Sequence, residues 1–424
     1  MDTCYVPWLH MHQPLLWLKN KLVTNVQKML SSEDSRESYD AKLILRAYKN
    51  PARYVKYLRK KGYRPKIMLD FSGILLESLQ NLGKDKTLDK IELEGEKIGD
   101  IIKLFKEVLK NFSDSIEMTG TAYAHCYFPA IPENDWPFQI EEWKNAYKKI
   151  FGKKELERVK GFWFPEMGIP GFEDKLAKLI KTIKESGYEW CILPLQAVDG
   201  YERLSLEKRI QVSCQPHLLK VKKQSIPVVF RVPSYFIDQQ AGCEANEIYR
   251  KSKEAGKIFN KVSKKPALIV PATDGENGNV MMNEFFPNTF VPFFEKMVDK
   301  NVSSLTVTEF LHQYYSKNEE IVPESEIKVK TIGASWVSNH RFWLEGTRRL
   351  EMVKKIQKLS KDFSDFKSSL EKKGLNKHLK DYIEAKRAFL IAETSCYVYW
   401  GTDFWFDQGE KAIELARKKM QIIY

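Results

Sequence analysis

The chain has 424 residues, of which 43% are hydrophobic and 29% charged, so general disorder is excluded and a globular protein with a sizeable core is expected. Lysine and arginine outnumber aspartate and glutamate by 69 to 56, which gives a formal charge of +13 and makes nucleic acid one candidate partner. Aromatic residues reach 12%, more than a core alone usually needs.

Short apolar runs alternate with long amphipathic segments along most of the chain, which predicts an α/β fold with a parallel sheet built from β-α units. Amphipathic stretches such as 87–112 and 246–262 have the apolar spacing of helices. Seven such units close more naturally into a barrel than into an open sheet. The seven runs are Tyr5 to Leu9, Lys66 to Asp70, Ile116 to Thr121, Gly161 to Phe164, Trp190 to Leu193, Val228 to Val232 and Leu268 to Ala272.

The pattern changes toward the C-terminus. The run Ser304 to Thr308 fits either an eighth strand or a turn into a helix over Glu309 to Tyr315. After Pro323 the sequence is almost continuously helical from Phe342 onward, with few turn signals, which predicts a bundle of about three helices. We therefore expect a barrel over residues 1–322 and a C-terminal helical domain over residues 323–424.

Targeting and redox signals are weak. The N-terminus lacks the basic, apolar and cleavage regions of a secretory signal, and no stretch approaches the roughly 18 to 20 apolar residues of a membrane span. The six cysteines show no CxxC or other metal-ligand spacing, so they are expected to be buried in a reducing compartment. We predict a cytoplasmic protein with no membrane partner.

Polar residues cluster where the predicted strands end, which is where parallel barrels place reactive side chains. His10 and His12 follow the first run, His125 the third, Glu166 the fourth and Asp274 the seventh. Five potentially reactive side chains are thus expected at one rim.

Glu166 and Asp274 are the strongest candidates. Each alone could be a helix N-cap or a surface acid, but together, on different strands beside histidines, they resemble a catalytic pair. Two carboxyl groups flanking a bond are what glycoside hydrolysis requires. A separation of about 5 to 5.5 Å favours retention of configuration, and about 6.5 to 9.5 Å favours inversion.

The histidines admit several interpretations. His10 and His12 lie two residues apart in a strand and so share a face, where they could bind a metal, donate to a substrate hydroxyl or be core residues. Together with a carboxylate they could bind zinc. His125, taken alone, fits a structural role as well as a functional one.

For the aromatic and the basic stretches, a structural role is favoured over a role in binding. The aromatic stretches around Trp163, Trp336 and Trp400 are more often core or domain-interface packing than ligand contacts, although flat rings also hold sugars. The basic region 46–66 keeps helical apolar spacing, so a solvated helix face is favoured over a nucleic-acid surface.

Several motifs, taken in order, resemble the signature regions of glycoside hydrolase family 57, and the resemblance spans nearly the whole chain. The motifs are His10-Met-His12-Gln13-Pro14, Glu117 to His125 with Pro129, Gly161-Phe-Trp-Phe-Pro-Glu166, Asp274-Gly-Glu-Asn277 and, in the helical region, Ala392 to Gly401. The segment Gly333 to Trp343 is also similar to the start of the helical domain in amylopullulanase-like members.

The resemblance implies an incomplete (β/α)7 TIM-like barrel followed by a C-terminal α-helical domain, acting with retention on α-glucans. By position, Glu166 would be the nucleophile and Asp274 the general acid/base. His10, His12 and His125 would hold sugar hydroxyls, and Trp163, Trp336 and Trp400 would stack on or close the subsites. No metal or other cofactor is implied.

The motifs also differ from the family pattern. Amylopullulanase-like members often carry an acid where Cys396 stands, and Asn277-Gly278-Asn279 lacks the aromatic residue that commonly follows the acid/base. Arg231 lies in a segment only loosely similar to the sixth-strand region. These differences bear on linkage specificity and subsites more than on the catalytic pair.

Hydrolysis of the amylase or amylopullulanase type is the favoured prediction, because no long insertion offers extended acceptor sites. A 4-α-glucanotransferase or a glycogen branching enzyme would use the same pair. A metal-dependent polysaccharide deacetylase and a non-catalytic glucan-binding protein rank lower, since a convincing HxxxH pair is lacking and both acids are present.

Overall fold

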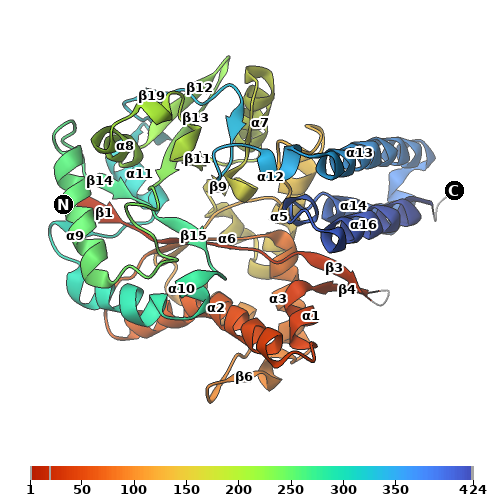
Figure 1. Cartoon of the computed structure of the whole chain (residues 1–424), viewed down its shortest axis with the longest axis horizontal. Helices are drawn as coiled ribbons and strands as arrows, with labels where there is room; N and C mark the ends of the chain where they lie inside the picture. Colours follow the sequence, from red (N-terminus) through yellow and green to blue (C-terminus); the bar gives the residue numbers. More distant parts are fainter. Residues whose placement is uncertain (1, 19–20, 422–424) are drawn as a thin grey trace.

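The computed structural model describes residues 2–18 and 21–421, which form a mixed α/β fold (Figure 1). Its strands are β1 (Thr3–Tyr5), β2 (Trp8–Met11), β3 (Leu15–Leu18), β4 (Lys21–Thr24), β5 (Ile67–Phe71), β6 (Glu92–Leu93), β7 (Glu96–Lys97), β8 (Ile116–Met118), β9 (Gly161–Trp163), β10 (Ile169–Pro170), β11 (Trp190–Pro194), β12 (His217–Val221), β13 (Gln224–Arg231), β14 (Ala267–Ile269), β15 (Ala272–Asp274), β16 (Val302–Ser303), β17 (Ser316–Lys317), β18 (Glu320–Ile321), β19 (Glu326–Ile327) and β20 (Gly333–Ala334). Its α-helices are α1 (Asn25–Leu30), α2 (Ser35–Lys60), α3 (Gly73–Lys84), α4 (Ile101–Asn111), α5 (Trp136–Phe151), α6 (Lys153–Glu157), α7 (Glu173–Glu185), α8 (Leu206–Ser213), α9 (Ala245–Phe259), α10 (Gly278–Met281), α11 (Val307–Tyr315), α12 (Arg341–Leu344), α13 (Thr347–Lys373), α14 (Leu379–Ala392), α15 (Cys396–Tyr399) and α16 (Asp403–Gln421).

The central strands run parallel. One sheet has the order β15-β2-β5-β8, and β9-β11-β13 are parallel neighbours in another. A parallel bridge between Gly120 and Phe162 joins the two sheets, and the amide of Val232 donates to the carbonyl of Val270 at 3.0 Å. The parallel sheets confirm the predicted α/β class, and their shared direction places the carboxyl ends of these strands at one rim.

Alternation along the strands separates two cores. In β11, Trp190 and Ile192 pack in a small cluster with Trp8 and Trp163. Cys191, between them, joins the larger cluster that includes the buried faces of the surrounding helices. Successive side chains of a strand point to opposite faces, so one apolar run supplies both cores.

Every predicted run contains a strand, but other details differ from the predictions. Of the two alternatives for the run 304–308, the structure shows the turn into a helix: Thr306 caps α11, and the short strand β16 lies just before it and pairs with β1. The helix expected over 87–112 was wrong in its first half. There β6 and β7 form a hairpin that turns at Gly95, whose φ of 79° favours glycine, and α4 begins only after Asp100.

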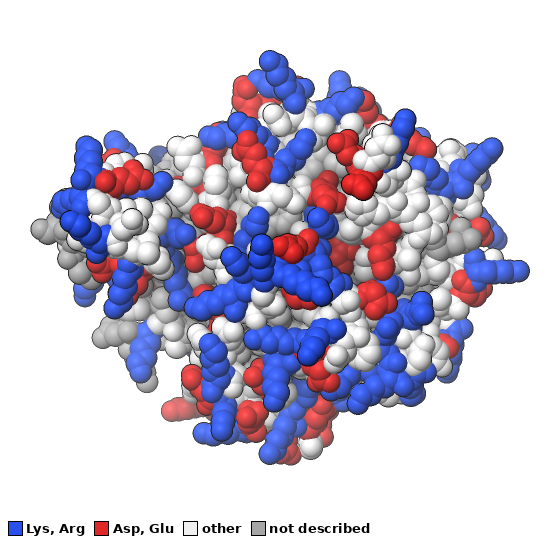
Figure 2. All heavy atoms as spheres, turned by 180° about the vertical axis from the view of Figure 1, so that it is seen from behind, with Lys and Arg blue, Asp and Glu red and all other residues white. Residues whose placement is uncertain are grey.

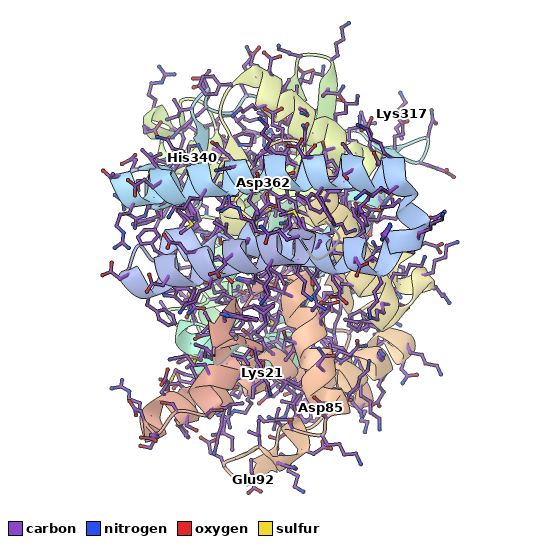
Figure 3. The ribbon with its side chains drawn as sticks, turned by 90° about the vertical axis from the view of Figure 1, so that its right-hand side faces the viewer. Lys21, Asp85, Glu92, Lys317, His340 and Asp362 are labelled. Atoms are coloured by element: carbon purple, nitrogen blue, oxygen red, sulfur yellow. The ribbon has the colours of Figure 1, made fainter. Side chains whose placement is uncertain are left out.

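The C-terminal helices lie together on one side of the molecule, where Figure 3 shows the long helices side by side, with Asp362 on α13. Their core includes the stacked rings of Phe363 and Phe389, 4.4 Å apart. They are tied to α5 by Lys386, which pairs with Glu142 at 2.6 Å.

Basic side chains are interleaved with acidic ones over the face shown in Figure 2. In the basic region 46–66, Arg46 pairs with Glu94 and Lys56 with Glu107. These pairs are what a solvated helix face would show. None of the helices within residues 2–18 and 21–421 has the length and apolarity of a membrane span.

Candidate active site

The parallel register brings the predicted residues to one rim. In β15, β2 and β5 the residues Asp274, His10 and Asp70 are neighbours across the sheet. Glu166 lies just after the end of β9, in a short 3-10 turn. Strand-end residues that are far apart in sequence are thus assembled by strand order alone.

Glu166 has an unusual backbone. Its φ of 58° and ψ of 15° lie in the left-handed region, which is rare for residues other than glycine and is often found at functional sites. The carboxylate accepts hydrogen bonds from Ser395 Oγ at 2.9 Å and from Trp336 Nε1 at 3.0 Å. The amide of Trp336 also donates to the carbonyl of Glu166 at 3.0 Å. Two segments of the C-terminal part therefore position this carboxylate.

A series of hydrogen bonds connects Glu166 to Asp70 in β5. Asp70 Oδ2 lies 2.5 Å from His10 Nδ1, and His10 Nε2 lies 2.8 Å from His125 Nε2. His125 Nδ1 lies 2.9 Å from Ser395 Oγ, which donates to Glu166. The series therefore runs from Asp70 through His10, His125 and Ser395 to Glu166.

The protonation states of His10 and His125 determine which group donates in each hydrogen bond of this series. Burial opposes protonation of His10, but the charge and hydrogen bond of Asp70 outweigh it and raise the pKa of His10 to about 9. Burial, together with the neighbouring histidines, lowers the pKa of His125 well below its usual value. At neutral pH, His10 therefore donates from both nitrogens and His125 is neutral, so its Nδ1–H donates to Ser395 and the Ser395 hydroxyl to Glu166.

Opposing effects also act on Glu166 itself. Burial raises the pKa of Glu166 to about 7, and the charge of Asp274 adds to this effect. The hydrogen bonds from Ser395 and Trp336 favour the ionised carboxylate and act in the opposite direction. Glu166 is thus poised to change its protonation state near neutral pH.

Asp274 lies in a more polar environment than Glu166. It is partly exposed, and its Oδ2 accepts from Asn277 Nδ2 at 2.9 Å. The partly buried guanidinium of Arg231 interacts with its charge. Glu276 Oε1 accepts from the amide of His12 at 3.2 Å, and burial, followed by the charge of Asp274, raises the pKa of Glu276 well above its usual value. The two acids of the Asp-Gly-Glu segment therefore occupy different environments.

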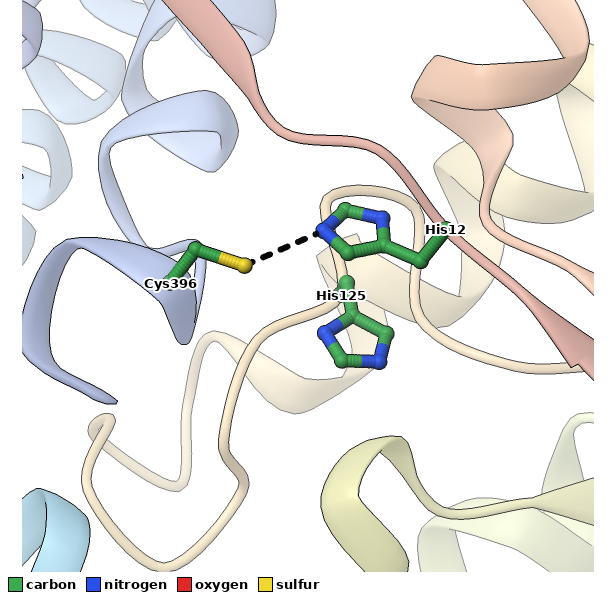
Figure 4. A group of neighbouring side chains, drawn as sticks. All are labelled: His12, His125 and Cys396. Carbon is green, nitrogen blue, oxygen red and sulfur yellow. Dashed lines mark hydrogen bonds between the residues drawn. The ribbon is translucent and has the colours of Figure 1, made fainter. Parts of the chain in front are cut away.

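His12 faces the C-terminal part. Its Nδ1 lies 2.8 Å from Ser72 Oγ, and the thiol of Cys396 donates to its Nε2 at 3.5 Å (Figure 4). The ring stacks on His125 with centroids 4.0 Å apart. Burial and the charge of His10 lower the pKa of His12 well below its usual value. His12, His125 and Cys396 are also grouped closely enough to hold a metal ion.

The three predicted tryptophans lie in different environments. Trp163 is 5% exposed, and its ring stacks on His10 with centroids 5.2 Å apart, so its position suits support of His10 rather than a free face for a sugar. Trp336 and Trp400 are 37% and 54% exposed. Both contact Tyr399, at 6.3 and 5.1 Å between centroids. Of the two, Trp336 contacts Glu166 directly, and Trp400 lies beyond Tyr399.

Some site residues were missed from the sequence. Asp70 ends the second predicted run, so its strand-end position could have identified it. Ser395 and Ser72 are ordinary serines with no motif of their own, and only the fold reveals their contacts with His125 and His12. Ser395 lies within the fifth motif, which was the available signal.

Comparisons with known proteins identify the family and the fold. A family model described as glycosyl hydrolase family 57 matches residues 6–329. Similar solved structures include the branching enzyme of Pyrococcus horikoshii, with a TM-score of 0.65, 14% identity and coverage of 99% of this chain and 88% of that one. The α-amylase of Thermotoga maritima has a TM-score of 0.65 and 13% identity, and the match covers 100% of this chain and 94% of that one. The 4-α-glucanotransferase of Thermococcus litoralis has a TM-score of 0.60 and 16% identity, and the match covers 98% of this chain and 60% of that one. At these identities the likeness shows the fold alone. A search of curated proteins finds no match.

Proposed function

The chain belongs to glycosyl hydrolase family 57 and is a glycoside hydrolase or α-glucan transferase, as the motifs predicted, and we propose that it cleaves α-glucans of the starch and glycogen type with retention. The observation that carries this proposal is the pair formed by Glu166 and Asp274. Both acids belong to one strand-end rim, and the charge of one raises the pKa of the other.

In the proposed mechanism Glu166 attacks the anomeric carbon while Asp274 protonates the glycosidic oxygen, so that the C–O bond breaks and a glycosyl-enzyme forms. Asp274, now ionised, takes a proton from water, and the resulting hydroxide equivalent displaces Glu166. Ser395 and Trp336 support the nucleophile by donating to its two oxygens. No step requires a metal.

The finer architecture belongs to the same proposal. Residues 1–322 would form the (β/α)7 barrel, and residues 323–424 a helical domain that completes the site. His10, His12 and His125 would hold sugar hydroxyls, with Trp336 and Trp400 closing the subsites. The contacts of Ser395 with both His125 and Glu166 support this role for the C-terminal domain.

Hydrolysis is the favoured outcome over transfer, although a sugar hydroxyl could replace water at the second step. Products from maltooligosaccharides, glycogen and pullulan distinguish the two. Shorter chains alone are expected, with the α-anomer appearing first in NMR spectra. Products longer than the starting sugar would establish transfer instead.

The catalytic pair is tested by Glu166→Gln and Asp274→Asn, each expected to lower kcat on soluble starch by about 10³-fold or more. The matched control is Glu117→Gln, because Glu117 is also a buried acid with its pKa raised by burial to about 7, but it lies in β8 and binds Thr308. Near-normal turnover by Glu166→Gln, with the control equally active, would overturn the assignment.

A further inference from the structure

Three soft or borderline ligand groups meet beside Glu166. His12, His125 and Cys396 each offer one ligand atom, and these atoms all lie within 4.8 Å of one another. All three residues are buried, with 6%, 3% and 8% exposure. Figure 4 shows the imidazole of His12 directed at the thiol and the ring of His125 beneath it. They come from three separate parts of the chain.

One edge of the group already has the dimensions of a tetrahedral zinc site. Zinc bonds sulfur at about 2.3 Å and imidazole nitrogen at about 2.0 to 2.1 Å, so a tetrahedral angle separates these ligand atoms by about 3.6 Å. The distance between Cys396 Sγ and His12 Nε2 is 3.5 Å. The other edges, none longer than 4.8 Å, need only small movements of side chains.

The ring of His12 is oriented for this role. Ser72 Oγ holds Nδ1 at 2.8 Å, which leaves Nε2 to face the thiol, as the outer partners of metal-bound histidines do. His125 would coordinate through Nδ1 in place of its bond to Ser395. Its Nδ1 proton leaves to solvent, and the Nε2 proton of His10 shifts to His125 Nε2, which then donates to His10.

The fourth position borders the catalytic carboxylate. Glu166 Oε1 lies 3.8 Å from His125 Nδ1, so an ion held by the three groups would lie next to it. A carboxylate oxygen is an accepted zinc ligand. An ion here would neutralise Glu166 and occupy the space of the sugar hydroxyls assigned to His12 and His125.

We propose that His12, His125 and Cys396 form a binding site for a thiophilic divalent cation such as Zn²⁺, and that the bound ion reversibly inhibits glucan cleavage. Binding releases the thiol proton of Cys396 to solvent as the sulfur–metal bond forms. The inhibition rests on the proposed function, whereas the binding does not. The ion plays no part in the catalytic steps.

The binding is tested without any activity measurement. Metal-free enzyme is titrated with Zn²⁺ by calorimetry, and with Co²⁺ to look for thiolate-to-cobalt absorption. One ion per chain is expected, and Cys396→Ser should weaken zinc binding by about 10-fold or more and abolish the absorption. Cys243→Ser is the matched control, because Cys243 is a partly exposed free cysteine outside the group, and it should bind like the wild type.

Thermal melts confirm that each variant is folded, and His12→Gln serves as a second test if Cys396→Ser is not. Absence of one-to-one binding, or equal affinity in the wild type and both ligand variants, would overturn the site.

Starch cleavage is then assayed with zinc and after addition of EDTA. Inhibition reversed by EDTA and reduced by Cys396→Ser is expected, whereas zinc-insensitive turnover despite binding would overturn the inhibition. Binding with no glucan turnover under any condition would instead refute the proposed function and leave the site standing.

Discussion

Glu166 titrates near neutrality, and the proposed role fixes the sign of its pH dependence. A nucleophile must be ionised, and burial with the charge of Asp274 raises the pKa of Glu166 to about 7. The value of kcat/KM on maltooligosaccharides should therefore rise with pH until it levels above about 7. Initial rates across the pH range measure it, since kcat/KM reports groups of the free enzyme. A fall in kcat/KM as pH rises through 7 would instead make Glu166 the general acid.

Ser395 sharpens this prediction, because its hydroxyl donates to Glu166 and favours the ionised carboxylate. Ser395→Ala should move the acid limb of the profile to higher pH. Ser213→Ala is the control: Ser213 is also buried and hydrogen-bonded, but it lies at the end of α8. A purely structural role for Ser395 would lower the rate at every pH and leave the limb in place.

At the scale of elements, the sequence predicted the structure correctly where a single hydrophobic pattern identifies the type of element. Apolar runs located the central strands, and strand ends located His10, Glu166 and Asp274, because a parallel sheet puts its carboxyl ends together. The hairpin β6–β7 was not predicted, because its apolar residues have the spacing of a helix and only glycine turns interrupt them. The contacts of Ser395 escaped because pairings between distant segments leave no local pattern.

The short β10–β20 pair places the segment that carries Trp336. Gly333 in β20 has a φ of 76°, and an added Cβ would lie 2.4 Å from the carbonyl oxygen of Ile169. Gly333→Ala should therefore displace β20, costing about 2 kcal/mol or more of unfolding free energy, and lower kcat/KM about tenfold as Trp336 shifts from Glu166. Urea unfolding and starch kinetics measure both effects.

Gly95→Ala provides the comparison for that experiment. Gly95 has a similar φ of 79°, but nothing lies within 4 Å of an added Cβ. It should lose only about 1 kcal/mol and keep its activity. Equal effects of the two substitutions would mean that close packing at Gly333 does not position the site.

At the scale of the whole molecule, a pair of acids, Glu393 and Asp135, lies where the C-terminal helices meet α5. Glu393, at the end of α14, accepts from Gln139 of α5 at 2.8 Å, and its other oxygen accepts no hydrogen bond from the residues that the structure describes. Burial, followed by the charge of Asp135, raises the pKa of Glu393 well above its usual value. The neighbouring Thr394 pairs with Cys126, and Ser395 follows it into the site. The charge state of this junction is therefore linked to the placement of Ser395.

The sign of the pH effect follows from proton binding. Because the folded state raises the pKa of Glu393, it holds a proton that the unfolded chain releases above about pH 4.3, so stability falls as pH rises toward the folded pKa. In Glu393→Gln, the introduced amide is uncharged at every pH, and it can still accept a hydrogen bond from Gln139 and donate one to Asp135. As the pH rises above about 4.3, the variant should gain stability steadily relative to the wild type, measured by urea unfolding at each pH. Glu384→Gln, a change to an exposed acid on the same helix, should keep the wild-type slope. If the unfolding free energies of the wild type and Glu393→Gln depend on pH in the same way, the contact between the C-terminal helices and α5 does not need a proton on Glu393. In that case the titration of Glu393 would not affect the position of Ser395.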